Sequence, residues 1–323
     1  MQDEKRGSKQ VTNWSAYNKS LCERGKITVF LTPEVTDNWH EQKKRIGSGK
    51  RNIYSDSTVL FMATIGEVYG LPYRQTQGFL EQVFMSNGIE LRVPNYTILS
   101  KRAKDPKVKD IIKKIDKLRG DGEEIYLVVD SSGIKVYGEY EWKVKKHGKE
   151  QRRKWRKLHI GIDMKSRKVV SHTLTSNDVH DGMEFGKLLD GSKEHGRRVS
   201  RLYADAAYSW HAIFDRLEDE FIMPRIPLPK NSVISGEDVD EAIMVMRPRD
   251  RALLEIYDAG GVEEWKKSTD YHQRSLVENF FSRFKTIFGE KMVQRRDDIR
   301  EFRASVRCLI LNKFADLGLP QYA

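Results

Sequence analysis

A nearly continuous apolar run, EIYLVVD at residues 124–130, constrains the fold of this chain more than any other stretch. A strand that is apolar on both faces is typical of a sheet with both faces buried. After it, strand-like and helix-like patterns alternate as far as about residue 229. This order predicts an α/β fold, in which helices flank a mixed sheet.

The alternation of patterns allows individual elements to be placed. Further strands are expected at 134–142, 157–164, 168–175, 198–205 and 221–229, and helices at 178–191, 209–220, 271–285 and 298–318. Residues 229 to about 268 hold Gly- and acid-rich clusters, which we interpret as an irregular insertion. We assign residues 121–323 to one domain that contains this insertion.

The region before the sheet has a helical pattern. Residues 1–54 form a mixed, polar N-terminal arm, whereas residues 55–120 show apolar spacing typical of short helices separated by tight turns. This pattern suggests a helix-turn-helix, and its last helix would present Lys101 and Arg102 to DNA. Any small helical bundle would look similar, so that alternative stays open.

The charge of the chain indicates the class of its partner. The 323 residues carry a net charge of +11, which points to a polyanionic partner, most simply nucleic acid. An anionic membrane is the rival partner, but no apolar run reaches about 20 residues and the first residues lack a signal-peptide pattern. The only cysteines, Cys22 and Cys308, have no metal-site spacing and fit a reducing cytoplasm. We expect a cytoplasmic protein.

Two aspartates follow apolar strands. Asp130 precedes the turn-like residues SSG, and Asp205 follows RLYA. Side chains at strand ends line the rim of a sheet, where α/β folds place their chemistry. Each aspartate also has an ordinary structural explanation, because Asp130 suits a turn and Asp205 suits a helix N-cap.

A third carboxylate lies on the predicted helix at 271–285. Four polar residues fall within an arc of roughly 60° when the segment is wound as a helix, namely Tyr271, Arg274, Glu278 and Lys285. The opposite side is apolar, from Leu276 to Ile287, as a core-facing helix requires. Alone, the polar side could be a solvated face with one Arg274–Glu278 ion pair.

Taken together, the three carboxylates suggest a metal site. Asp130, Asp205 and Glu278 in a basic protein suit two Mg²⁺ or Mn²⁺ ions about 3.5–4 Å apart, which would promote phosphodiester cleavage. We therefore expect their carboxyl oxygens to converge. Paired carboxylates also serve glycoside hydrolysis, but that reaction gives no reason for the positive charge.

The spacing Tyr271-x2-Arg274-x3-Glu278-x6-Lys285 resembles the C-terminal signature of DDE transposases from bacterial insertion sequences. Further blocks resemble the IS-five group in the family's order: NWSAYNKSLCERGKIT, VVDSSGIKVYGEYEWKVKKHG, RRKWRKLHIGID, LTSNDVHD, YADAAY and IPLPKNS. The resemblance implies a ribonuclease-H-like core with Asp130, Asp205 and Glu278 as catalytic metal ligands. It also implies DNA contacts on the same helix face: Arg274 and Lys285 would bind phosphates, and Tyr271 would stack on a base or bind a phosphate. It further implies strand cleavage and strand transfer on double-stranded DNA, at the terminal inverted repeats of an insertion sequence, by a homodimer.

A basic stretch lies between two of the expected strands. Residues 143–157 contain nine Lys or Arg residues against one acid, and Trp142 and Trp155 lie near its ends. We predict that it tracks DNA phosphates, through residues that include Lys145, Lys146, Arg152 and Arg153. A solvated hairpin is the alternative.

The remaining polar motifs are interpreted structurally. The eight histidines show no paired zinc spacing, and Asp178 and Asp181 are read as caps at the start of a helix rather than as metal ligands. Two other functions stay open: a nuclease without strand transfer, and an inactive or domesticated protein that only binds DNA.

Overall fold

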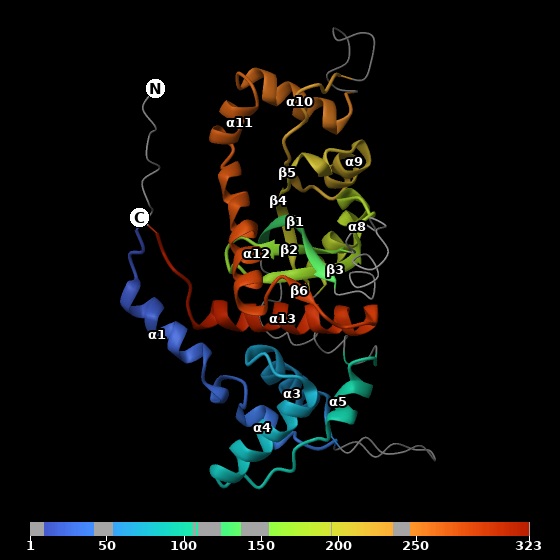
Figure 1. Ribbon diagram of the computed structural model, residues 1–323. Coiled ribbons are helices and arrows are strands. Elements are labelled where there is room, and N and C mark those ends of the chain that lie inside the picture. Colours follow the sequence, from blue (N-terminus) through green and yellow to red (C-terminus); the bar gives the residue numbers. More distant parts are fainter. Residues whose placement is uncertain are drawn as a thin grey trace, which may run out of the picture. The chain divides into compact units, whose positions relative to one another are not determined.

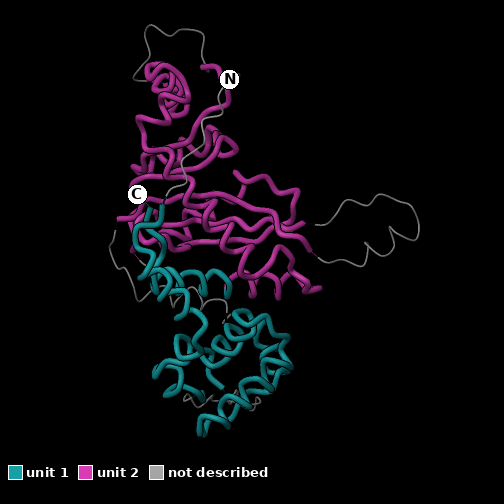
Figure 2. Tube along the Cα trace, turned by 60° about the vertical axis from the view of Figure 1, so that its left-hand side comes forward, with its two compact units in different colours: residues 1–111, 306–323 teal, residues 112–305 magenta. Residues whose placement is uncertain are grey.

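The computed structural model describes residues 10–41, 54–105, 108, 124–136, 155–194, 196–234 and 246–322. The chain forms two compact units (Figure 2), one of residues 112–305 and the other of residues 1–111 with 306–323. The C-terminal residues therefore group with the N-terminal helices, whereas the sequence pattern placed them with the sheet.

The N-terminal unit is helical. Its elements are α1 (Trp14–Arg24), η1 (Ile27–Val29), α2 (Pro33–Asp37), α3 (Asp56–Val68), α4 (Tyr73–Ser86) and α5 (Tyr96–Arg102). The short helices expected after residue 55 are present as α3, α4 and α5. Most residues of α3 are buried, and Ser55 caps this helix by accepting a hydrogen bond from the Thr58 amide. A helix-turn-helix role for these helices stays a prediction.

The second unit is built on one mixed sheet. Its strands are β1 (Glu124–Val136), β2 (Trp155–Asp163), β3 (Val169–Ser176), β4 (Arg198–Tyr203), β5 (Met223–Arg225) and β6 (Lys291–Met292). The main path runs β3-β2-β1-β4-β5, and β6 pairs with β1. Strands β1, β2 and β3 pair antiparallel, whereas β4 pairs parallel with β1 and with β5. The expected mixed α/β sheet is confirmed.

Strand β1 corrects one expectation. The sequence placed a turn at Ser131-Ser132-Gly133, but the strand continues through these residues to Val136. Continuous antiparallel pairing with β2, which sets Ser131 opposite His159, overrides the local turn preference. Asp130 is therefore an interior residue of a long strand and does not end it.

Helices cover the sheet, which lies between α8 and α12 in Figure 1. Outside the predicted insertion, the helical elements that follow β3 are α8 (Asp181–Lys193), η3 (Ala206–Tyr208), α9 (His211–Asp219), η4 (Tyr271–Arg274), α12 (Ser275–Phe288) and α13 (Asp297–Leu317). The core on the α8 side joins Ile125, Leu127 and Val129 of β1 to apolar residues of α8 and α9. Alternation along a strand therefore directs Asp130 to the other face of β1.

The insertion predicted as irregular contains two helices, so that interpretation was wrong for its described part. They are α10 (Pro248–Asp258) and α11 (Val262–Ser268). Leu253, Ile256 and Trp265 on these helices are buried in the core that also contains α8 and α9. The glycines Gly260 and Gly261, taken as a sign of irregularity, only separate the two helices, and both have positive φ.

Candidate active site

The sheet brings Asp130 and Asp205 to the same level. The parallel register between β1 and β4 pairs Tyr126 with Arg201 and Val128 with Tyr203. Asp130 lies two residues after Val128, and Asp205 lies two residues after Tyr203, so the two aspartates are at the same level. Neighbouring strands lie about 4.8 Å apart. Asp205 then turns the chain into η3, where its carboxylate accepts a hydrogen bond from the Ala207 amide. Both the rim position and the N-cap predicted for Asp205 are therefore present.

Arg274 connects the first and third predicted carboxylates. Its Nη1 donates to Asp130 Oδ2 at 2.9 Å, and its Nη2 donates to Glu278 Oε1 at 2.7 Å. The Asp130 and Arg274 side chains are 17% and 22% exposed, whereas the Glu278 side chain is 59% exposed. Arg274 thus forms the i,i+4 pair expected within the helix and also an ion pair with a residue 144 positions away.

Burial dominates the electrostatics of Asp130. It raises the pKa of this carboxyl from 3.8 to about 6, while the Ser131 amide and the Arg274 guanidinium act in the opposite direction. The negative charges of Asp205 and Asp181 raise the pKa further. A carboxyl group whose pKa is raised by burial and by neighbouring carboxylates is a common feature of functional sites.

The remaining polar residues of this helix have different surroundings. Tyr271 is buried and its hydroxyl donates a hydrogen bond to the Ala204 carbonyl at 3.0 Å, so the phenol links η4 to the residue that follows β4. Lys285 is half-buried on α12. The apolar side is confirmed by the buried Val277 and Phe284, but Ile287 is 36% exposed and does not extend it.

The donor atoms fit a hard divalent cation, because carboxylate oxygens are the ligands that Mg²⁺ and Mn²⁺ prefer. In the described part of the chain, however, no three carboxylate, His or Cys groups lie close enough to hold a metal ion. The three carboxylates are not gathered around one point, and the Arg274 guanidinium supplies the positive charge between Asp130 and Glu278. Metal binding here would require Arg274 to move, and ligation by the three residues stays a prediction.

Comparison with protein families decides the class of the chain. A family model described as a transposase DDE domain matches residues 121–312, which is more than half of the chain. The chain belongs to the DDE transposase family. A second model with the same description matches residues 22–139 of the transposase.

Two solved structures are also similar to this chain. A piggyBac transposase synaptic complex with hairpin DNA aligns over 95% of this chain and 77% of its own, at 11% identity and a TM-score of 0.41. The Mos1 strand transfer complex aligns over 87% of this chain and 82% of its own, at 15% identity and a TM-score of 0.22.

Several residues near the carboxylates were not found from the sequence. Tyr208 of η3 is fully buried, and its hydroxyl has no hydrogen-bond partner among the described residues. Burial, together with the charges of Asp181, Asp130 and Asp205, raises the pKa of this phenol. The cap of α8 is His180, whose Nδ1 accepts from the Gly182 amide, so reading Asp181 as the cap was wrong. The block YADAAY was the one signal that could have pointed to Tyr208.

The other predicted DNA contacts divide into three groups. Lys145, Lys146, Arg152 and Arg153 lie outside the described residues, so their role stays a prediction. Lys101 is exposed on α5 and remains available for a phosphate. Arg102 is only 8% exposed, and its guanidinium pairs with Asp56 and donates to the Tyr54 carbonyl. Arg102 therefore stabilises the helical unit, and we do not include it in the DNA contacts proposed below.

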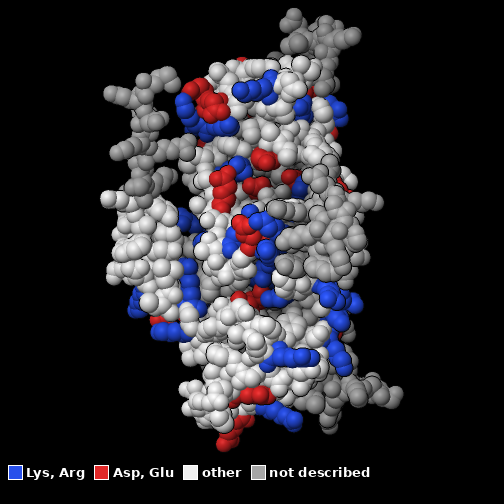
Figure 3. All heavy atoms as spheres, viewed as in Figure 1, with Lys and Arg blue, Asp and Glu red and all other residues white. Residues whose placement is uncertain are grey.

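Acidic and basic side chains lie side by side at several places on the face shown in Figure 3. No helix in the described ranges is long and apolar enough to cross a membrane.

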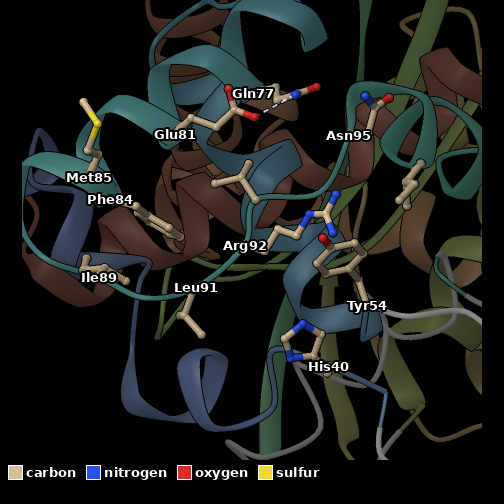
Figure 4. A pocket seen from close by; sticks show the side chains of 12 residues that line it. His40, Tyr54, Gln77, Glu81, Phe84, Met85, Ile89, Leu91, Arg92 and Asn95 are labelled. Carbon is tan, nitrogen blue, oxygen red and sulfur yellow. Dashed lines mark hydrogen bonds between the residues drawn. The ribbon is translucent and has the colours of Figure 1, made fainter.

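A pocket of about 630 Å³ in the N-terminal unit is lined by residues that include His40, Tyr54, Gln77 and Arg92 (Figure 4). None of the three catalytic candidates lines it, and its polar residues include the hydrogen-bonded pair Gln77 and Glu81.

Proposed function

We propose that this chain is a DNA transposase of the IS-five-like group that cleaves and transfers DNA strands at the ends of an insertion sequence. The observation that supports the proposal is that Asp130 on β1 lies level with Asp205, just after the adjacent strand β4, and that Arg274 links Glu278 to Asp130. A ribonuclease-H-like topology for the mixed sheet is part of this proposal.

In the proposed site, Asp130, Asp205 and Glu278 hold two Mg²⁺ or Mn²⁺ ions. The chemistry such ions supply is activation of a water or 3′-hydroxyl and stabilisation of the leaving oxygen. The Ser131 amide, which donates to Asp130 Oδ1 at 2.7 Å, fixes that carboxylate from the main chain. Arg274, once released from Asp130, offers its planar fork to a DNA phosphate beside the site, and Lys285 offers a second positive charge on α12.

The proposed substrates are the terminal inverted repeats of the element and a target duplex. The net charge of +11 favours binding to their phosphates, through the basic stretch at 143–157 and through Lys101 in the helical unit. We propose a homodimer on paired ends, in the bacterial cytoplasm and associated with the nucleoid.

The test replaces Glu278 with Gln. The amide keeps the shape of the side chain but is a poor ligand for Mg²⁺, and the position is exposed enough to tolerate the change. We expect near-normal melting without metal, retained DNA binding, a smaller increase in Tm with Mn²⁺, and loss of nicking of an end-bearing duplex. Cleavage at the wild-type rate by this variant would exclude Glu278 as a metal ligand and with it the proposed mechanism.

A further inference from the structure

A polar cluster lies across β1 from the Asp130–Arg274 pair, on the face covered by α8. At its centre is Asp181, the first residue of α8. Its Oδ1 accepts hydrogen bonds from Ser131 Oγ at 2.9 Å and from Lys157 Nζ at 3.1 Å. Lys157 also donates to the Val179 carbonyl at 3.0 Å, which ties the segment before α8 to strand β2.

The histidine beside this cluster does not supply its positive charge. His159 is fully buried, and burial lowers its pKa, so the ring is neutral near pH 7. Its Nε2 lies 2.8 Å from Thr175 Oγ1, and its Nδ1 lies 3.6 Å from Asp181 Oδ1, beyond hydrogen-bonding distance. Lys157 therefore compensates the charge of Asp181. Among the hydrogen bonds of the described residues, the only one that joins Asp181 to β1 comes from the Ser131 hydroxyl.

Helix α8 packs close to the sheet, which helps to fix the position of Asp181. A side chain at Gly161 of β2 would have its Cβ 2.4 Å from Ser171 Oγ and 3.1 Å from Ser192 Oγ of α8. These two hydroxyls are hydrogen-bonded to each other at 2.8 Å. At the start of the helix, Gly182 lies against the ring of Trp210, whose centroid is 4.8 Å from that of the His180 ring.

Ser131 joins the two faces of the sheet. Its hydroxyl is directed to Asp181 on the α8 side, while its main-chain N–H donates to Asp130 Oδ1 at 2.7 Å. We propose that Asp181 is a positioning residue, which clamps Ser131 from behind the sheet so that the Ser131 amide holds the Asp130 carboxylate in the orientation that binds the catalytic cation. This inference rests on the function proposed for Asp130.

The consequence concerns metal affinity more than folding. A hydrogen bond from a neighbouring group that orients a metal-ligating residue commonly contributes 10- to 100-fold to metal affinity. Without the clamp, the Ser131 side chain loses its tether to α8, and only the pairing of β1 with β2 then holds the amide that orients Asp130. We therefore expect the dissociation constant for Mn²⁺ to rise about 10-fold when the clamp is removed.

The experiment measures Mn²⁺ binding to the full-length protein without DNA, by electron paramagnetic resonance of the free ion. Ser131→Ala removes the hydroxyl but keeps the amide, and Asp181→Asn removes the charge. The matched control is Asp178→Asn, three residues earlier and exposed, and Ser131→Thr restores a hydroxyl. We expect weaker binding by about 10-fold for Ser131→Ala and Asp181→Asn, and wild-type binding for the control and for Ser131→Thr.

The outcomes separate this inference from the function on which it rests. If Asp130→Asn binds Mn²⁺ as the wild type does, the metal site itself is misplaced and the proposed function fails. If Asp130→Asn loses binding while Ser131→Ala binds Mn²⁺ within 2-fold of the wild type, the site is correct and the clamp is refuted. Because Ser131→Ala deletes a single oxygen, it decides the question even if Asp181→Asn does not fold.

Discussion

Replacing Arg274 with Gln tests whether its guanidinium stands in for a metal ion. The change removes a hydrogen bond to the 17% exposed Asp130 and the i,i+4 pair with the exposed Glu278. A hydrogen bond to a charged group contributes about 1.5–3 kcal/mol, and the exposed pair adds about 0.2–0.5 kcal/mol. We therefore expect the free energy of unfolding to fall by about 2 kcal/mol at pH 8 in EDTA, within the range of these two contributions.

The loss of stability caused by Arg274→Gln should be smaller at low pH. Asp130 has a pKa of about 6, so at pH 5 it is mostly protonated and its bond to Arg274 is that of a neutral acceptor. The loss should then shrink to about 1 kcal/mol or less. Saturating Mn²⁺ should raise the Tm of Arg274→Gln more than that of the wild type, because no cation has to be displaced.

Denaturant unfolding at pH 5 and pH 8, with and without Mn²⁺, measures both effects. Lys285→Gln is the matched control, since it removes one positive charge from the same helix about three turns further on. An Arg274→Gln variant that is equally destabilised at both pH values, or that gains less from Mn²⁺ than the wild type, would refute the reasoning.

Three further predictions concern the same unit. The carboxyl of Asp130 binds its proton more tightly in the folded protein than in the unfolded chain, so its contribution to stability falls as pH rises from about 4 to about 6. The free energy of unfolding of Asp130→Asn in EDTA, relative to that of the wild type, should therefore rise by about 3 kcal/mol over that range. A difference between the two proteins that does not change with pH would contradict this expectation. Tyr271→Phe should cost about 1 kcal/mol, because the Ala204 carbonyl loses its donor, with DNA affinity unchanged; a several-fold loss of affinity would make the phenol a DNA contact. Replacing Lys145, Lys146, Arg152 and Arg153 with Ala should lower the salt slope of DNA binding by about 0.9 for each lost phosphate contact, whereas an unchanged slope would assign the stretch to a solvated hairpin.

The sheet could be predicted because its strands contain enough apolar residues to be identified from the sequence pattern alone. The run at 124–130 and the later strand patterns match β1 to β5, and the helical patterns match α8, α9 and α12. The extension of β1 through Ser131-Ser132-Gly133 was not predictable, because pairing with residues 24 to 28 positions away (157 − 133 and 159 − 131) overrides the turn preference. The helices α10 and α11 were missed because their buried residues are few and are separated by Gly260 and Gly261.

The carboxylates of the site could be identified from the sequence, but their partners could not. Asp130, Asp205 and Glu278 stood out by position and by the spacing of the helix that carries Glu278. The ion pair between Arg274 and Asp130 spans 144 positions, and the bond from Ser131 to Asp181 spans 50. Such contacts depend on register and on helix placement, which no local pattern encodes.

The most direct test of the site is a crystal structure of the protein with Mn²⁺, in which anomalous diffraction locates the ions. We predict two Mn²⁺ ions bound by Asp130, Asp205 and Glu278, about 3.5–4 Å apart, with the Arg274 guanidinium moved away from Asp130. Manganese bound elsewhere, with Arg274 still joining Asp130 to Glu278, would contradict the account.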